Sequence, residues 1–155
     1  MYKFYIVTFV LLGLLLCPVG EEFCTLSEDY EIGIYEFYLT EFVELDSAET
    51  IRNGDGWIVR CAIERARSIK KEIGENIEGE SFTIYGGKEI VNKIIDKAQA
   101  SIVKEGKTGD VYCYYLYSGK INARSITVFD RKVNLQIAVS KNEITVGYPI
   151  ILGSY

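Results

Sequence analysis

The sequence predicts an α+β fold in which an antiparallel β-meander carries a long amphipathic helix packed on one face. Two observations predict it. Apolar and polar residues alternate from Val133 to Ser140 and can pair with a second strand across a short turn, and an apolar stripe with helical spacing runs from Lys88 to Lys104. Two further apolar segments between them have the spacing of a hairpin. One helix followed by four consecutive antiparallel strands therefore gives a helix layer on a sheet.

The last two strands have the clearest pattern. Apolar and polar residues alternate from Val133 to Ser140, as in a strand with one buried face. If Lys141-Asn142 is a two-residue turn, four apolar pairs fall on one face of the sheet. They are Val139 with Ile144, Ile137 with Val146, Leu135 with Tyr148 and Val133 with Ile150. A shift by one residue would turn the whole set toward water, so the pattern specifies the register.

The helix predicted over 88–104 precedes these strands. Its apolar stripe consists of Ile90, Val91, Ile94, Ile95, Ala98 and Ile102. Glu89 near the start and Lys104 near the end suit the helix dipole, and Gly106 is a natural stop. The segments 111–117 and 121–129, separated by a Ser-Gly-Lys turn, are then predicted to pair as a hairpin.

The first half of the chain is less regular. Residues 30–50 fit both a strand and a helix, with a strand favoured at the start. Asn53-Gly54-Asp55-Gly56 predicts a tight reversal. A strand follows with Trp57, Val59, Cys61 and Ile63 on one face, and then a short helix with Ala62, Ala66, Ile69 and Ile73 on one face and its end at Gly74. Residues 74–80 are read as a solvated acidic connector, and 81–85 as a strand.

The first twenty residues have the pattern of an export signal. One cation, Lys3, precedes an apolar run about as long as a signal-peptide core. We therefore expect residues 1–20 to be a signal peptide or an N-terminal membrane anchor, 21–27 a tether and 28–155 a single α+β domain. This predicts an extracytoplasmic protein, secreted or anchored at the outer face of the cell membrane, that meets the membrane only through its N-terminal segment.

Net charge and cysteine content limit the possible partners and the number of disulfides. After residue 20, 16 Lys and Arg stand against 22 Asp and Glu, a net charge of −6. Nucleic-acid binding depends on neutralising phosphates, so no nucleic-acid partner is expected. Beyond Cys17 in the leader, Cys24, Cys61 and Cys113 remain. An odd number allows at most one disulfide, and small buried thiols are the favoured interpretation.

The chain contains no histidine, which removes the commonest general base and the commonest zinc ligand. Ser68-Ile69-Lys70-Lys71 and Lys107-Thr108-Gly109 match two penicillin-binding motifs, but the third motif is missing and their occurrence is attributed to chance. Gly86-Gly87-Lys88 is interpreted as a strand-to-helix turn, and 53–56 as a turn instead of a calcium loop. The acidic residues Glu72, Glu75, Glu78 and Glu80 are interpreted as a solvated face. No catalytic residue, cofactor or metal is expected.

Four tyrosines in the segment 111–117 are the candidate binding residues. Tyr115 and Tyr117 share one face of the predicted strand, and Tyr112 and Tyr114 share the other. Whichever face is outward would present aromatic rings with hydroxyl groups at their edges, which could stack on sugars or contact a protein. Ordinary packing within the sheet is the competing interpretation.

The end of the chain resembles a known family. Residues 134–138, Thr145, Gly147, Pro149, Ile150, Ile151 and the terminal Tyr155 are similar to the closing motif of the YwmB-like family of exported proteins from Gram-positive, spore-forming bacteria. The resemblance covers about the last 23 residues. It implies a fold like the TATA-box-binding protein, a curved antiparallel sheet with helices on one side, and no established activity.

Together these features predict an exported, non-enzymatic binding or assembly module of the cell envelope. Its expected partner is an envelope protein or a glycan. The alternative is a cell-wall-acting enzyme that uses lysine and serine, or carboxylates, without histidine.

Overall fold

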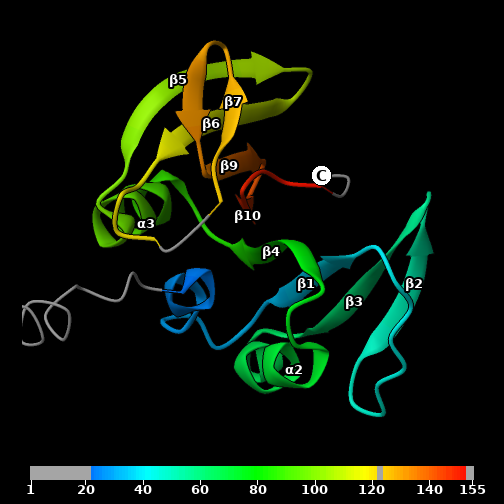
Figure 1. The fold of residues 1–155 in the computed structure, drawn as a ribbon. Helices are drawn as coiled ribbons and strands as arrows, with labels where there is room; N and C mark the ends of the chain where they lie inside the picture. Colours follow the sequence, from blue (N-terminus) through cyan, green and yellow to red (C-terminus); the bar gives the residue numbers. More distant parts are fainter. Residues whose placement is uncertain (1–21, 122–123, 153–155) are drawn as a thin grey trace, which may run out of the picture.

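The computed structural model describes residues 22–121 and 124–152, and its main element is an eight-stranded antiparallel sheet (Figure 1). The strand order is β2-β3-β1-β4-β10-β9-β6-β5. The strands are β1 (Ile34–Leu39), β2 (Glu49–Asn53), β3 (Gly56–Ala62), β4 (Ile77–Tyr85), β5 (Ser101–Thr108), β6 (Val111–Tyr117), β9 (Leu135–Ser140) and β10 (Glu143–Tyr148). A separate two-stranded sheet pairs β7 (Ile126–Val128) with β8 (Arg131–Val133). The predicted α+β class with an antiparallel sheet is confirmed.

The sheet has two four-stranded halves. The N-terminal half contains β1 to β4, and the C-terminal half contains β5, β6, β9 and β10. They meet where β4 pairs with β10, at the middle of the sheet in Figure 1. In the chain, α2 lies between β3 and β4 of the N-terminal half, and α3 connects β4 to β5 of the C-terminal half.

The helices share one core on one face of the sheet. α2 (Ala66–Ile73) buries Ala66, Ile69 and Ile73, and α3 (Lys88–Ala98) buries Val91, Ile94 and Ala98. The short 3-10 helices η1 (Phe23–Ser27) and η2 (Ile63–Arg65) add to this layer. In η1, Phe23 and Leu26 are buried in the same core. Residues 23–27 are therefore part of the packed domain and not the expected polar tether.

The opposite face of the sheet carries a small second cluster. Cys113 on β6 and Ala138 on β9 pack there with Ile151, which follows β10. The Ile151 backbone N–H donates to Oε1 of Gln136 at 3.1 Å. A Cβ atom on Gly147 would lie 2.5 Å from Cγ1 of Ile151, so only glycine lets the chain fold back this closely. Ile151 therefore packs on the face of the sheet opposite α2 and α3.

The predicted register of the last two strands is confirmed, and two of the four predicted pairs form. Val139 pairs with Ile144 and Ile137 with Val146, across a turn at residues 141–142. The other two pairs do not form in this ladder. Leu135 and Tyr148 lie one step beyond the last pair, Gln136 with Gly147, while Val133 belongs to β8 and pairs with Ile126. Val133 cannot join this ladder, because β9 begins at Leu135 and β8 precedes it in a separate ribbon.

The predicted hairpin of 111–117 with 121–129 is wrong. β6 pairs with β5 along one edge and with β9 along the other, so both of its edges are occupied. The chain after β6 leaves the sheet, forms the β7–β8 ribbon and returns as β9. The meander of four consecutive strands is thus interrupted by this ribbon.

The long helix predicted over 88–104 is also wrong in its C-terminal third. α3 ends at Ala98, and Gln99 adopts a left-handed conformation with φ 48°. Residues Ser101–Thr108 form the edge strand β5, which pairs with β6. Ile102, assigned to the helical stripe, is 49% exposed. Pairing with β6 decides the structure of this segment against its local helical pattern.

In the first half, the strand at the start of residues 30–50 is confirmed as β1, and the reversal at 53–56 joins β2 to β3. The helix ending at Gly74 is confirmed as α2, although Ala62 is exposed. The prediction of a solvated connector at 74–80 is wrong, because β4 begins at Ile77 and Glu80 is buried.

Cys24, Cys61 and Cys113 are buried and belong to no disulfide, which confirms the interpretation as buried thiols. In the two ranges that the structure describes, no helix combines the length and apolar character needed to cross a membrane. The leader expected at residues 1–20 lies outside the described residues.

Candidate functional site

Strand β6 divides the four candidate tyrosines between the two faces of the sheet. Tyr114 joins the main core on the helix side and is 7% exposed, and Tyr112 lies beside it with 37% exposure. Tyr115 faces the other way and packs against the second cluster. The alternation predicted from the sequence is therefore seen, and it places two tyrosines near the helices.

Tyr112 and Tyr114 line a hollow of about 330 Å³ at the start of α3. Their ring centroids are 5.0 Å apart with an interplanar angle of 58°. Lys88, the first residue of α3, and Val139 on β9 complete the lining. Val139 pairs directly with Tyr112 across the β6–β9 ladder. Three separate elements thus converge on one small aromatic site.

The polar groups of this hollow are the Lys88 ammonium and the hydroxyl groups of Tyr112 and Tyr114. Burial and the nearby carboxylate of Glu105 raise the pKa of Tyr112 and of Tyr114. Both phenols therefore remain protonated at neutral pH. Lys88 is exposed and forms no ion pair within the described part of the chain. The hollow combines apolar ring surface with one free ammonium and two hydroxyl groups.

Tyr115 and Tyr117 do not contribute to the hollow. Tyr115 packs edge-on against Phe129 with ring centroids 5.4 Å apart, and the Lys104 ammonium lies 3.6 Å from the Phe129 ring centroid. Tyr117 is 39% exposed on the same face as Tyr115. The interpretation as ordinary sheet packing applies to Tyr115.

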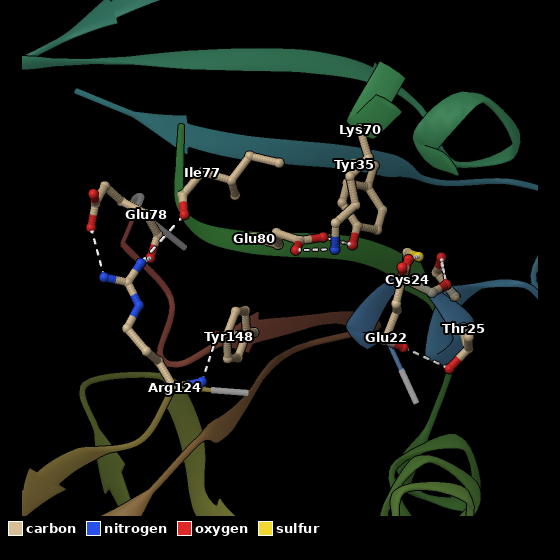
Figure 2. A network of polar contacts seen from close by, with 11 residues as sticks. Glu22, Cys24, Thr25, Tyr35, Lys70, Ile77, Glu78, Glu80, Arg124 and Tyr148 are labelled. Atoms are coloured by element: carbon tan, nitrogen blue, oxygen red, sulfur yellow. Dashed lines mark hydrogen bonds and ion pairs between the residues drawn. The ribbon is translucent and has the colours of Figure 1, made fainter. Parts of the chain in front are cut away.

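A second polar cluster lies under α2, around the buried carboxylate of Glu80 (Figure 2). The Lys70 ammonium contacts Oε1 of Glu80 at 2.6 Å, and the Tyr35 hydroxyl donates to Oε2 at 2.6 Å. Glu80 is 2% exposed. Burial and this carboxylate together raise the pKa of Tyr35 well above its usual value. The carboxylate therefore has a charged donor and a neutral donor on its two oxygens.

Cys24 of η1 lies beside this cluster and donates its thiol to Glu22 Oε2 at 3.4 Å, as Figure 2 shows. Burial raises the pKa of Cys24 to about 11, although Lys70 opposes the shift. The thiol is consequently protonated at neutral pH and poorly suited to act as a nucleophile. The contacts of Glu80 with Lys70 and Tyr35 fix α2, β1 and β4 to one another.

The sequence reading missed Glu80, which it assigned to a solvated acidic run. Glu72, Glu75 and Glu78 are exposed, as expected, so Glu80 is the exception. A signal was present: Glu80, Phe82 and Ile84 alternate in one strand, and Phe82 and Ile84 are core residues. Extending that period of two by one step would have placed Glu80 on the buried face.

The two penicillin-binding motifs and the Gly86-Gly87 turn lie in different parts of the fold. Ser68 donates its hydroxyl to the Arg65 carbonyl at 2.9 Å and lies on α2. Lys107 and Thr108 end β5 and Gly109 follows, in the other half of the sheet (Figure 1). The two penicillin-binding motifs thus belong to different halves. Gly86-Gly87 form the turn from β4 into α3, as predicted.

Comparison of the chain with protein-family models, with curated proteins and with solved structures gives no match.

Proposed function

We propose that this chain is an exported, non-enzymatic binding or assembly module of the cell envelope, and that the Tyr112–Tyr114 hollow is its contact site. The observation that carries the proposal is the convergence of β6, β9 and the start of α3 on an open, aromatic-lined hollow. Pockets of this kind, mainly apolar with a few polar groups, are typical of ligand sites. The two tyrosines among the lining residues are also candidates from the sequence.

We also propose membership of the YwmB-like family and a fold like the TATA-box-binding protein. The antiparallel sheet with both helices in one core supports this fold. The similarity of residues 134–155 to the family's closing motif supports the family. The same similarity, with the pattern of the first twenty residues, supports an extracytoplasmic location.

Binding to envelope material tests the contact site. Sedimentation of the full chain with purified cell-wall and membrane fractions should show binding that Tyr112→Ala reduces several-fold. Tyr117→Ala is the matched control, because it removes a tyrosine of nearly equal exposure from the same strand but the opposite face. Equal loss in both variants, or no binding by the unaltered chain, would contradict the proposal.

A further inference from the structure

We propose that the Tyr112–Tyr114 hollow binds a sugar unit that carries a carboxylate, with Lys88 as its counter-ion. This inference rests on the proposed function and names the ligand class of the same site. It combines three properties of the hollow: its aromatic walls, its size and its single free cation.

The walls suit a sugar ring. A pyranose has an apolar face of C–H groups and a rim of hydroxyls, so it packs on an aromatic ring while its edge makes hydrogen bonds. Tyr112 and Tyr114 offer two rings at 5.0 Å, with Val139 beside them. The Tyr114 hydroxyl can donate to a ring or substituent oxygen, and the Tyr112 hydroxyl, which donates to Glu105, can accept from a sugar hydroxyl. Tyrosine therefore provides both kinds of contact from one side chain.

The size favours a small ligand over a protein surface. At about 330 Å³ the hollow lies at the lower end of the range for small-molecule sites. A stable protein interface buries roughly 800 Å² on each partner, which is much more than four lining residues provide. A single sugar unit of a longer glycan fits this scale.

The charge selects an acidic sugar. Lys88 is the one charged residue among the four that line the hollow. Two carboxylates near the hollow, one in the chain and one in the sheet, have hydrogen-bond partners. Glu105 accepts a hydrogen bond from Tyr112, and Glu89 accepts the Gly87 backbone N–H at 3.2 Å. The Lys88 ammonium therefore remains available for a charge-assisted bond to a ligand carboxylate.

The test compares two sugars that differ by one carboxylate substituent, N-acetylmuramic acid and N-acetylglucosamine. Titration of the full chain, followed by NMR of the tyrosine side chains, should show tighter binding of the acidic sugar. Lys88→Gln should weaken binding of N-acetylmuramic acid roughly five- to tenfold and leave that of N-acetylglucosamine unchanged. Lys93→Gln, an exposed lysine of α3 that does not line the hollow, is the control and should change neither.

Ring contact is tested separately from charge. Tyr112→Ala should weaken binding of both sugars at least tenfold, whereas Tyr112→Phe should retain most of it, because the ring is kept. The unfolding midpoint of each variant checks that it is folded. Binding of the acidic sugar that is unaffected by Lys88→Gln, or that survives Tyr112→Ala, would overturn the inference.

Failure of the ligand assignment can be told apart from failure of the proposed function. If envelope material still binds in a Tyr112-dependent way but neither sugar binds at millimolar concentration, the sugar assignment is overturned and the binding module stands. If envelope material does not bind either, the proposed function fails as well.

Discussion

At the scale of single residues, Glu80 stands out as the one buried charged residue in the part of the chain that the structure describes. A carboxylate with 2% exposure is costly to bury unless both oxygens are paired. Lys70 and Tyr35 meet that need at 2.6 Å each. They come from α2 and β1, so the pairing also fixes the position of the helix over the sheet. The loss of one partner should therefore affect the whole N-terminal half.

Replacing Lys70 by methionine tests this pairing. The change keeps most of the aliphatic side chain but leaves Glu80 buried beside a neutral group. We expect the free energy of unfolding at pH 7 to fall by on the order of 2–3 kcal/mol, below the range for fully buried pairs because the Lys70 side chain is 25% exposed. Urea titration measures it.

Lys71→Met is the control, because Lys71 is exposed and forms no ion pair in the described residues. It should change stability by no more than about 0.5 kcal/mol. Equal effects of the two substitutions would show that Glu80 does not depend on Lys70.

At the scale of elements, the end of α3 decides the layout of the C-terminal half. Ser118, just after β6, donates its hydroxyl to the Ala98 carbonyl at 2.5 Å, and Lys120 donates to the Lys97 carbonyl at 3.3 Å. These bonds satisfy carbonyls that the last helical turn leaves free. Gln99 then turns the chain in the left-handed region, and β5 begins at Ser101.

Gln99→Gly should stabilise the protein. The left-handed conformation costs a residue with a Cβ atom roughly 1 kcal/mol, whereas glycine adopts it without this steric cost. We expect the free energy of unfolding to rise by about 0.5–1 kcal/mol, measured by urea titration. Lys93→Gly, within the same helix, should instead lower it by about 1 kcal/mol. Destabilisation by Gln99→Gly would mean that the helix does not end at this residue.

At the scale of the whole molecule, the main core under the helices contains several ionisable groups that the fold keeps protonated. Burial raises the pKa of Cys24 and of Cys61 from 9.0 to about 11. Burial and Glu80 raise the pKa of Tyr35. Burial alone would lower the pKa of Lys70, but the Glu80 carboxylate raises it overall. All four shifts have the same consequence for stability.

The protein should lose stability in alkaline solution. Above pH 9 the unfolded chain releases these protons while the native state holds them, so the unfolded state binds fewer protons and stability falls as pH rises. The free energy of unfolding should decline between pH 9 and about 11, followed by urea titration at each pH. Replacing Cys24 and Cys61 by alanine should make this decline shallower. A flat profile to pH 11 would contradict the prediction.

Part of the fold could be read directly from local patterns. The turn at residues 53–56, the helix ending at Gly74 and two of the four predicted apolar pairs between β9 and β10 follow from turn residues and periodicity. The alternation of tyrosines along β6 also follows from the period of two. These features depend only on neighbours in sequence or across one short turn.

The tertiary structure decided the rest, because the deciding contacts come from distant parts of the chain. The sequence alone established an antiparallel α+β domain and the opposite faces of Tyr112 and Tyr115. Which strands flank β6, where α3 ends and why Glu80 is buried depend on β5, β9 and Lys70. Only the packed sheet brings Lys88 and Val139 beside Tyr112. Local periodicity shows which face of an element is apolar, but it does not show which distant element will bury that face.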